Sequence, residues 1–348
     1  MNPHKPLAQA LLEAIRSLDF ASTADKALGG APLAHFPSID LAVLQFVDGQ
    51  PAQWANVLFS REHPQGVAAT IAEPAGAVSG ILFDKDLQGD KLDSIAWLPD
   101  AGWGQLPWSH LHGQGLRFVA PYPASLLKVM VAVGVGLAVD RGLCDWPAAL
   151  ESMIVVSDND ATTECVALLH RVGMIDQLNQ RLAALGLATL QLNGTKADGG
   201  WRNADGSGVG QIHMTAWDTV RLLWLLDETS PPAGWLAPGT RLLSQASREH
   251  LMAVLRRQKL NEILSSGSLR SVPGWVEGLP DSPAFAHKTG TTDNYASDAG
   301  VVRRGEVHYI VAVLTNLGRR YAAHERCATT WRLPALGAAV HRLMTAAR

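Results

Sequence analysis

The amino-acid sequence predicts a two-lobed α+β fold, in which a sheet built from both ends of the chain carries an inserted helical lobe. Strand-like runs occur near the N-terminus, in LAVLQFV (41–47) and SGILF (79–83), and again near the C-terminus, in AFAHK, SDAGVV and EVHYIVAVLTNL. Between them, residues 124–186 have the helical spacing of apolar residues. Strands at both ends with helices between them imply one sheet assembled from the two ends.

The expected elements follow in order along the chain. The first twenty residues have the apolar period of an amphipathic helix, and the N-terminal strands come next. After the helical stretch, TKADGGWRNADGSGVG (195–210) consists almost entirely of turn-forming residues and predicts a long loop. Helical patterns return in HMTAWDTVRLLWLL and SREHLMAVLRRQ, before the three C-terminal strands. A last helix is expected at 328–346.

The composition indicates a globular chain. With 348 residues, 47% of them hydrophobic, the chain can bury a large core. Its 29 basic and 32 acidic residues leave no positive surplus for a phosphate backbone or an anionic membrane. The longest apolar run, at 129–139, is too short to span a bilayer. We therefore expect no nucleic-acid partner and no membrane insertion.

The N-terminus and the cysteines bear on location. Glu13 and Arg16 interrupt the apolar residues before a secretory core could form, so we expect a cytoplasmic protein, or a periplasmic one if the native N-terminus is longer. Cys144, Cys165 and Cys327 lie far apart without a CxxC pair, which is typical of reduced packing thiols. None of the three has the context of a nucleophile.

A serine and a lysine lie three residues apart in FVAPYPASLLKVMVAVGVG. On a helix, Ser125 and Lys128 would share one face and touch. Lys128 is the only charged residue between Phe118 and Asp140, and an apolar environment disfavours the charged form of a lysine. A neutral amine can take the proton of a serine hydroxyl, which is what a serine nucleophile needs where no histidine serves it.

Ser-x-x-Lys alone is weak evidence, because a chain of this length contains about one by chance. Two rarer triplets follow it, Ser157-Asp158-Asn159 and Lys288-Thr289-Gly290. The set resembles the signature of class A β-lactamases and penicillin-binding proteins. MIVVSDNDATTECVALL resembles the family segment in which the serine caps a helix. RLLSQASREHLMAVLRRQK and HKTGTTDNYASDAGVV resemble its late helix and its active-site strand, so that the resemblance covers residues 118–343.

The resemblance implies the β-lactamase/transpeptidase-like fold, an antiparallel sheet flanked by the terminal helices with an inserted all-helical lobe. It also implies a division of the chain. Residues 1–117 would contribute an N-terminal helix and extra strands and loops to the sheet lobe, and residues 118–348 would form the β-lactamase-like catalytic domain.

The same resemblance implies roles for the motif residues. Ser125 is the acylated nucleophile, and Lys128 is its general base, directly or through water. Ser157 relays the proton to the leaving amine. The backbone N–H groups of Ser125 and Thr291 form the oxyanion hole. The residues expected to bind the substrate, by its side-chain amide, its carboxylate or along the strand, are Asn159, Lys288, Thr289, Gly290 and Thr291.

The sequence departs from the family in the loop that normally carries a glutamate for deacylation. No glutamate occurs in residues 165–227. The loose alignment places Asp198 near the missing glutamate and Asn203 near its usual asparagine partner, with Asp205 as a rival base. An acid in such a loop is also a common solvated turn former, and this alternative stays open. A shorter helical hairpin between Ser125 and Ser157 predicts a more open cleft.

The N-terminal part is longer than the family places before its nucleophile. Trp97, Trp103 and Trp108 are expected either to shape a substrate wall or lid or simply to pack. His110 and His112 alternate as on one strand face, but no third metal ligand is apparent, so we expect no metal site and no cofactor.

The sequence therefore predicts a serine hydrolase that forms an acyl-enzyme on Ser125 from a small-molecule amide or ester, either a β-lactam or a peptide-like or other small metabolite. The alternative is a penicillin-binding or sensor-type module that is acylated without efficient turnover. An α/β-hydrolase is excluded, because no Gly-x-Ser-x-Gly elbow is present. The sequence leaves the oligomeric state open.

Overall fold

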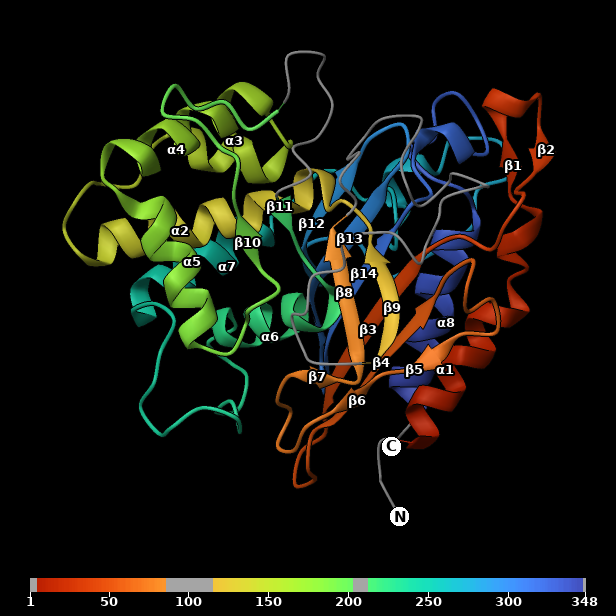
Figure 1. Ribbon diagram of the computed structural model, residues 1–348, viewed down its shortest axis with the longest axis horizontal. Helices are drawn as coiled ribbons and strands as arrows, with labels where there is room; N and C mark the ends of the chain where they lie inside the picture. The colour runs from red at the N-terminus through yellow and green to blue at the C-terminus, as the bar shows by residue number, and fades with distance from the viewer. Residues whose placement is uncertain (1–4, 86–114, 203–211, 347–348) are drawn as a thin grey trace.

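The computed structural model describes residues 5–85, 115–202 and 212–346. Figure 1 shows a central sheet with a helical lobe beside it and the two terminal helices packed on its other face. The mixed α+β architecture with an antiparallel sheet confirms the fold class that the sequence predicts. The predictions for the tryptophans and histidines of the N-terminal part concern residues outside the described ranges, namely Trp97, Trp103, Trp108, His110 and His112.

The main sheet has six strands in the order β12-β13-β14-β3-β4-β5, and every neighbouring pair is antiparallel. Its two halves join where the N-terminal β3 pairs with the C-terminal β14, with Ala42 opposite Ala312. Both ends of the chain therefore build one sheet. The strands are β3 (Ile39–Phe46), β4 (Gln53–Phe59), β5 (Val67–Ala68), β12 (Phe285–Thr291), β13 (Ala296–Arg304) and β14 (Val307–Thr315).

Strand β3 is buried at every position because both faces of the sheet are covered. Alternate side chains point to opposite faces of a strand. Leu41 and Val43 accordingly join the core beneath α1 (Lys5–Ser17) and α8 (Arg332–Ala346), whereas Ala42 and Leu44 join the core shared with the helical lobe. The sheet thus separates two apolar cores.

The helical lobe surrounds α2 (Lys128–Asp140), whose residues are buried from Lys128 through Ala138. Small residues permit this burial, since a Cβ on Gly134 would lie only 2.9 Å from Leu169 Cδ1. The helices around it are α3 (Ala149–Val155), α4 (Asn159–Arg171), α5 (Met174–Ala184), α6 (Ala216–Leu226) and α7 (Gln245–Leu255).

Short elements complete the described chain. β8 (Ile81–Lys85) pairs in parallel with β9 (Leu116–Ala120). The predicted boundary at 117/118 falls inside β9, and the division into two domains stays a prediction. The remaining strands are β1 (Ala24–Asp25), β2 (Ala31–Pro32), β6 (Thr70–Ile71), β7 (Val78–Ser79), β10 (Gln191–Leu192) and β11 (Ile212–His213). The 3-10 helix η4 (Ala124–Leu127) leads into α2.

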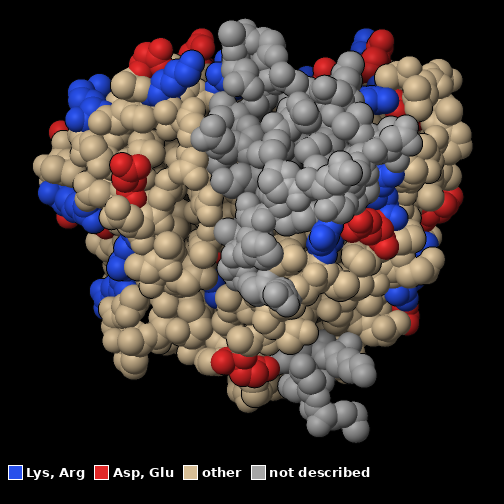
Figure 2. All heavy atoms as spheres, in the orientation of Figure 1, with Lys and Arg blue, Asp and Glu red and all other residues tan. Residues whose placement is uncertain are grey.

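Two surface properties follow from these elements. In the part of the chain that the structure describes, no helix is both long and apolar enough to cross a membrane. On the face shown in Figure 2, basic and acidic side chains are interspersed around the edges. The absence of a nucleic-acid partner stays a prediction.

Candidate active site

Ser125 lies in η4, a tight turn that leads directly into α2. Its neighbours Ala124 and Leu126 are buried, while Ser125 itself is only partly buried and therefore reachable. Ala124 has a φ of 50°, a left-handed conformation that costs free energy in a non-glycine residue. The strained residue, Ala124, thus comes directly before the serine that the turn exposes.

Strand β12 lies directly against this turn. A Cβ on Gly290 would lie 2.4 Å from Pro123 O and 2.6 Å from Leu126 N, so a larger residue could not sit there without moving backbone. Ser297 Oγ of the neighbouring β13 donates a hydrogen bond to Pro123 O at 2.5 Å. These contacts fix the Ser125 turn against the strand that carries Lys288.

Lys128 is fully buried at the start of α2. Its Nζ donates hydrogen bonds to Ser157 O at 2.7 Å, Ser157 Oγ at 3.1 Å and Asn159 Oδ1 at 2.9 Å, and reaches Asp158 O at 3.3 Å. Burial, followed by the positive charge of Lys288, lowers the pKa of Lys128 to about 6. Within the described residues, Lys128 forms these hydrogen bonds with Ser157, Asp158 and Asn159, and none with Ser125.

Ser157 lies between α3 and α4 with a φ of 59°, another left-handed non-glycine residue. Its hydroxyl accepts hydrogen bonds from Lys128 Nζ at 3.1 Å and from Lys288 Nζ at 3.0 Å. The expectation that this serine caps the helix was wrong, because Asp158 is the N-cap of α4 and accepts from Ala161 N at 2.9 Å. The left-handed turn points the Ser157 hydroxyl toward the two lysines, and the next residue takes over the cap.

Lys288 is fully buried on β12 and donates to Ser157 Oγ and, at 2.7 Å, to Thr289 O. Burial lowers the pKa of Lys288 to about 7, although the charges of Asp298 and Glu262 oppose this shift. Further along the strand, Thr291 Oγ1 is buried and has no hydrogen-bond partner among the described residues. A substrate group is a natural partner for such a hydroxyl.

Trp201 was not among the site residues predicted from the sequence. Its ring is buried, and Lys128 Nζ lies 5.4 Å from the ring centroid, while Arg202 Cζ lies 5.0 Å from the same centroid. The positive charge of Arg202 adds to the lowering of the pKa of Lys128. The indole Nε1 is buried and finds no acceptor among the described residues. A signal was available, because Trp201 is the only aromatic residue in the turn-rich stretch 195–210.

Asp198 is exposed and lies in a turn three residues before Trp201. Its Oδ1 accepts a hydrogen bond from Gly200 N at 2.9 Å, the local pattern of an Asx turn. Gly199 has a φ of 93° and packs so tightly that a Cβ would lie 2.3 Å from Thr163 O. Asp198 thus has the geometry of a turn-forming residue, the alternative that the sequence left open. Its role as the deacylating base stays a prediction. Asn203 and Asp205 lie outside the described residues.

A second buried group behind β12 was also missed. His287 Nδ1 lies 2.7 Å from Asp298 Oδ1, and both side chains are fully buried. His287 Nε2 lies 3.2 Å from Asn261 Oδ1, and Asp298 Oδ2 accepts from Leu264 N at 3.0 Å. The pair therefore ties the segment after α7 to the strand of Lys288. Within the described residues, no group of three or more potential ligands could hold a metal ion.

Comparisons with known proteins agree with this fold. The solved structures that match at low identity include the β-lactamase from Sphaerobacter thermophilus DSM 20745 (14% identity, TM-score 0.54, 98% of each chain) and a class A β-lactamase representative from Bacteroides cellulosilyticus DSM 14838 (16% identity, TM-score 0.51, 97% of this chain and 96% of that one). No curated protein matches the sequence.

A family model described as the beta-lactamase enzyme family matches residues 145–330, more than half of the chain. The matched segment contains Ser157, Asn159 and Lys288, whereas Ser125 and Lys128 precede it. The chain therefore belongs to the beta-lactamase enzyme family, with the fold that its class A members have.

Proposed function

We propose that this protein is a serine hydrolase that forms an acyl-enzyme on Ser125 from a small amide or ester, such as a β-lactam or a peptide-like metabolite. One observation supports this most strongly. The Ser157 hydroxyl bridges two buried lysines, Lys128 and Lys288, whose pKa values are lowered to about 6 and about 7. Two such amines on one hydroxyl, with Ser125 three residues before Lys128, support a proton-transfer role rather than that of two structural charges.

Acylation begins with Lys128. At neutral pH a lysine with a pKa of about 6 is mostly an uncharged amine, which has a lone pair for the Ser125 proton. In the free protein, Lys128 Nζ is hydrogen-bonded to Ser157 and Asn159. The proton of Ser125 therefore moves to Lys128 either through a water or after a small shift of the side chains on substrate binding. Catalytic hydrogen bonds commonly tighten only when the substrate is bound.

The acyl carbon then forms a bond to Ser125 Oγ, and the bond to the leaving nitrogen or oxygen breaks. The Ser157 hydroxyl gives its proton to the leaving group and regains one from Lys128. The backbone N–H groups of Ser125 and Thr291 are the proposed oxyanion donors. Lys288 and the unpartnered hydroxyl of Thr291 are the proposed anchors for a substrate carboxylate.

A second candidate function has its own support. Beside Lys128 the described loop presents Trp201 and the cation Arg202, and the carboxylate of Asp198 is engaged in a surface turn. Hydrolysis of the acyl-enzyme needs a base over a water, which typically contributes about 10² to 10⁴ in rate. Without one, the protein would be acylated and stay acylated, as a penicillin-binding or sensor-type module.

Intact-protein mass spectrometry distinguishes these functions. The protein would be exposed to penicillins, D-Ala-D-Ala peptides and activated esters, and the adduct followed after the free compound is removed. We expect an adduct with at least one acyl donor, lost in Ser125→Ala and retained in the matched control Ser17→Ala, an exposed serine on α1. Labelling that persists in Ser125→Ala and maps to another serine would refute the proposal.

A further inference from the structure

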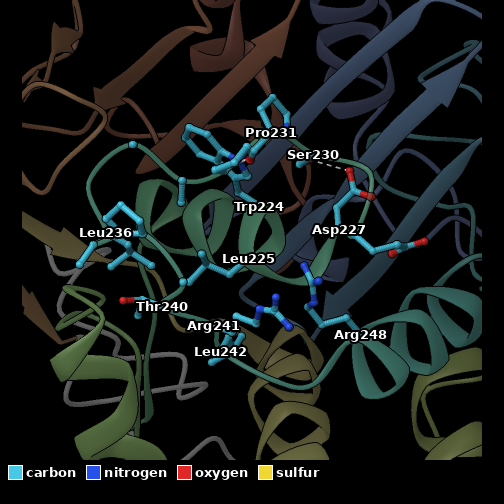
Figure 3. A pocket seen from close by; sticks show the side chains of 17 residues that line it. Trp224, Leu225, Asp227, Ser230, Pro231, Leu236, Thr240, Arg241, Leu242 and Arg248 are labelled. Atoms are coloured by element: carbon cyan, nitrogen blue, oxygen red, sulfur yellow. Dashed lines mark hydrogen bonds between the residues drawn. The ribbon is translucent and has the colours of Figure 1, made fainter.

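A cavity of about 750 Å³ lies apart from the candidate active site, between the end of α6 and the start of α7. Residues of the segment 230–242 form much of its wall, and no residue of the proposed catalytic set lines it. Its volume falls within the range of about 300 to 1,000 Å³ that is usual for small-molecule sites. Figure 3 shows the side chains that surround it.

Packing and a hydrogen bond hold the apolar wall of the cavity in place. Trp224 Nε1 donates a hydrogen bond to Pro231 O at 2.7 Å, which holds the covering segment against α6. The Trp224 ring also packs edge-on against Trp235 and Phe46, with centroids 5.1 and 5.2 Å away. Leu236 completes this side of the cavity. The wall therefore exists before any ligand arrives, as in most small-molecule sites.

The charged side chains that line the cavity differ in whether they form hydrogen bonds or ion pairs. Asp227 accepts hydrogen bonds from Thr229 and Ser230 and contacts His308, and Glu228 pairs with Arg256 at 3.2 Å, leaving only its Oε2 without a partner. Arg248 is different, because its Nε is buried and has no acceptor. Neither Arg241 nor Arg248 forms a side-chain hydrogen bond or ion pair with any residue that the structure describes.

We propose that this cavity binds a small carboxylate with an apolar body, such as an aryl-alkanoate. The carboxylate would lie between Arg241 and Arg248, whose planar guanidinium groups match its geometry. The apolar body would pack against Trp224 and Leu236. In Figure 3 both arginine side chains line one part of the cavity, and Trp224 and Leu236 line other parts.

The test uses three probes that share one body: 3-phenylpropanoate, the neutral 3-phenylpropanamide and the cationic 3-phenylpropylamine. The reporter is the Trp224 indole N–H cross-peak in a ¹H–¹⁵N NMR spectrum, identified by its loss in Trp224→Phe. We expect saturable shifts of this peak with 3-phenylpropanoate and at least tenfold weaker binding of the other two, because neither of them offers an anion to the two guanidinium groups.

Variants identify the charges responsible. Arg248→Gln and Arg241→Gln should each weaken binding of 3-phenylpropanoate about tenfold, while Arg304→Gln, a change at an exposed arginine on β13, should leave it unchanged. Arg241 is itself exposed, so its variant tests the proposal even if Arg248→Gln fails to fold.

Equal affinity for the acid and the amide would overturn the proposal, as would unchanged binding in Arg241→Gln. The titration is repeated in Ser125→Ala, where the same shifts are expected because no acyl chemistry is involved. Loss of the shifts in that variant would place the ligand at Ser125 and refute a separate site. The readout does not depend on turnover, so it stands whether or not the proposed hydrolase activity is found.

Discussion

The two sides of the candidate active site differ in how their side chains are held. On one side, Ser157, Lys128 and Lys288 form a buried network in which one hydroxyl contacts two amines within 3.1 Å. On the other side, the loop of Asp198 and Trp201 presents an Asx turn, an aromatic ring and a nearby cation. The first side has groups suited to acylation. The second has no comparable arrangement for deacylation among the described residues.

Under the proposed mechanism, acylation and deacylation depend on opposite sides of the same site. Acylation requires a base for the serine and a proton donor for the leaving group, and both have candidates on the networked side. Deacylation requires a further base for water. The difference can be tested by changing one side at a time.

The largest effect is expected for Lys128→Arg on the networked side. A guanidinium stays protonated at neutral pH and cannot take the serine proton, so the acylation rate should fall by about 10² to 10⁴. Stopped-flow or mass-spectrometric labelling measures this rate. Lys259→Arg, at an exposed lysine, is the matched control. A variant that keeps most of its acylation rate would remove Lys128 from the mechanism.

The next effect concerns the support behind Lys288. His287→Ala leaves Asp298 Oδ1 buried without its imidazole partner, and a buried polar group left unsatisfied typically costs about 1 to 3 kcal/mol in the free energy of unfolding. Urea denaturation measures the loss. His324→Ala, at a partly exposed histidine, should cost less than about 1 kcal/mol. Equal losses in the two variants would show that the buried pair contributes little.

A smaller effect is expected for Trp201→Ala, which opens the far side of Lys128 to water. Burial is the main cause of the lowered pKa of Lys128, so this pKa should rise toward its ordinary value. The base must be uncharged, and the acylation rate therefore increases with pH through about 6 in the parent and through a higher pH in the variant. At pH 6 the variant should react several-fold more slowly, since one pH unit of displacement corresponds to about tenfold.

Trp201→Phe is the conservative control, because it keeps most of the bulk that excludes water. Its pH profile should stay close to that of the parent. A profile that is the same in all three proteins would mean that Trp201 does not set the protonation of Lys128.

The smallest effect is expected for Asp198→Asn. Asparagine preserves an Asx turn and removes only the charge, so the lifetime of the acyl-enzyme should change less than about twofold if Asp198 is a turn former. A chase experiment after removal of free acyl donor measures this lifetime. A fleeting adduct that becomes a lasting one in Asp198→Asn would instead make Asp198 the deacylating base.

The sequence predicted the networked side better than the loop side for a physical reason. Ser125, Lys128, Ser157 and Lys288 lie in short local motifs, and local spacing is visible in a sequence. Trp201 reaches Lys128 only through the path of a loop rich in turn residues, which no periodicity describes. The contact of His287 with Asp298 likewise depends on the pairing of β12 with β13, in which Thr289 lies opposite Asp298.

The N-cap of α4 shows a limit of prediction from sequence at the level of single residues. Ser157 and Asp158 are both good N-cap residues, so sequence alone does not choose between them. The left-handed backbone at Ser157 makes Asp158 the N-cap, because it turns the Ser157 hydroxyl away from the helix and toward the lysines. The sheet itself was predicted in part: the run at 41–47 and the three C-terminal runs join one sheet, whereas the run at 79–83 pairs with β9 outside it.

The pairing of β3 with β14 has a consequence for how the chain is made. Ala42 and Ala312 lie opposite each other although 270 residues separate them in the sequence (312 − 42). During synthesis, β3 and the β4 that follows it can form a hairpin, but the edge of β3 that β14 occupies stays open until β14 itself has been made. Pairings of such long range form slowly, and an open apolar edge invites aggregation.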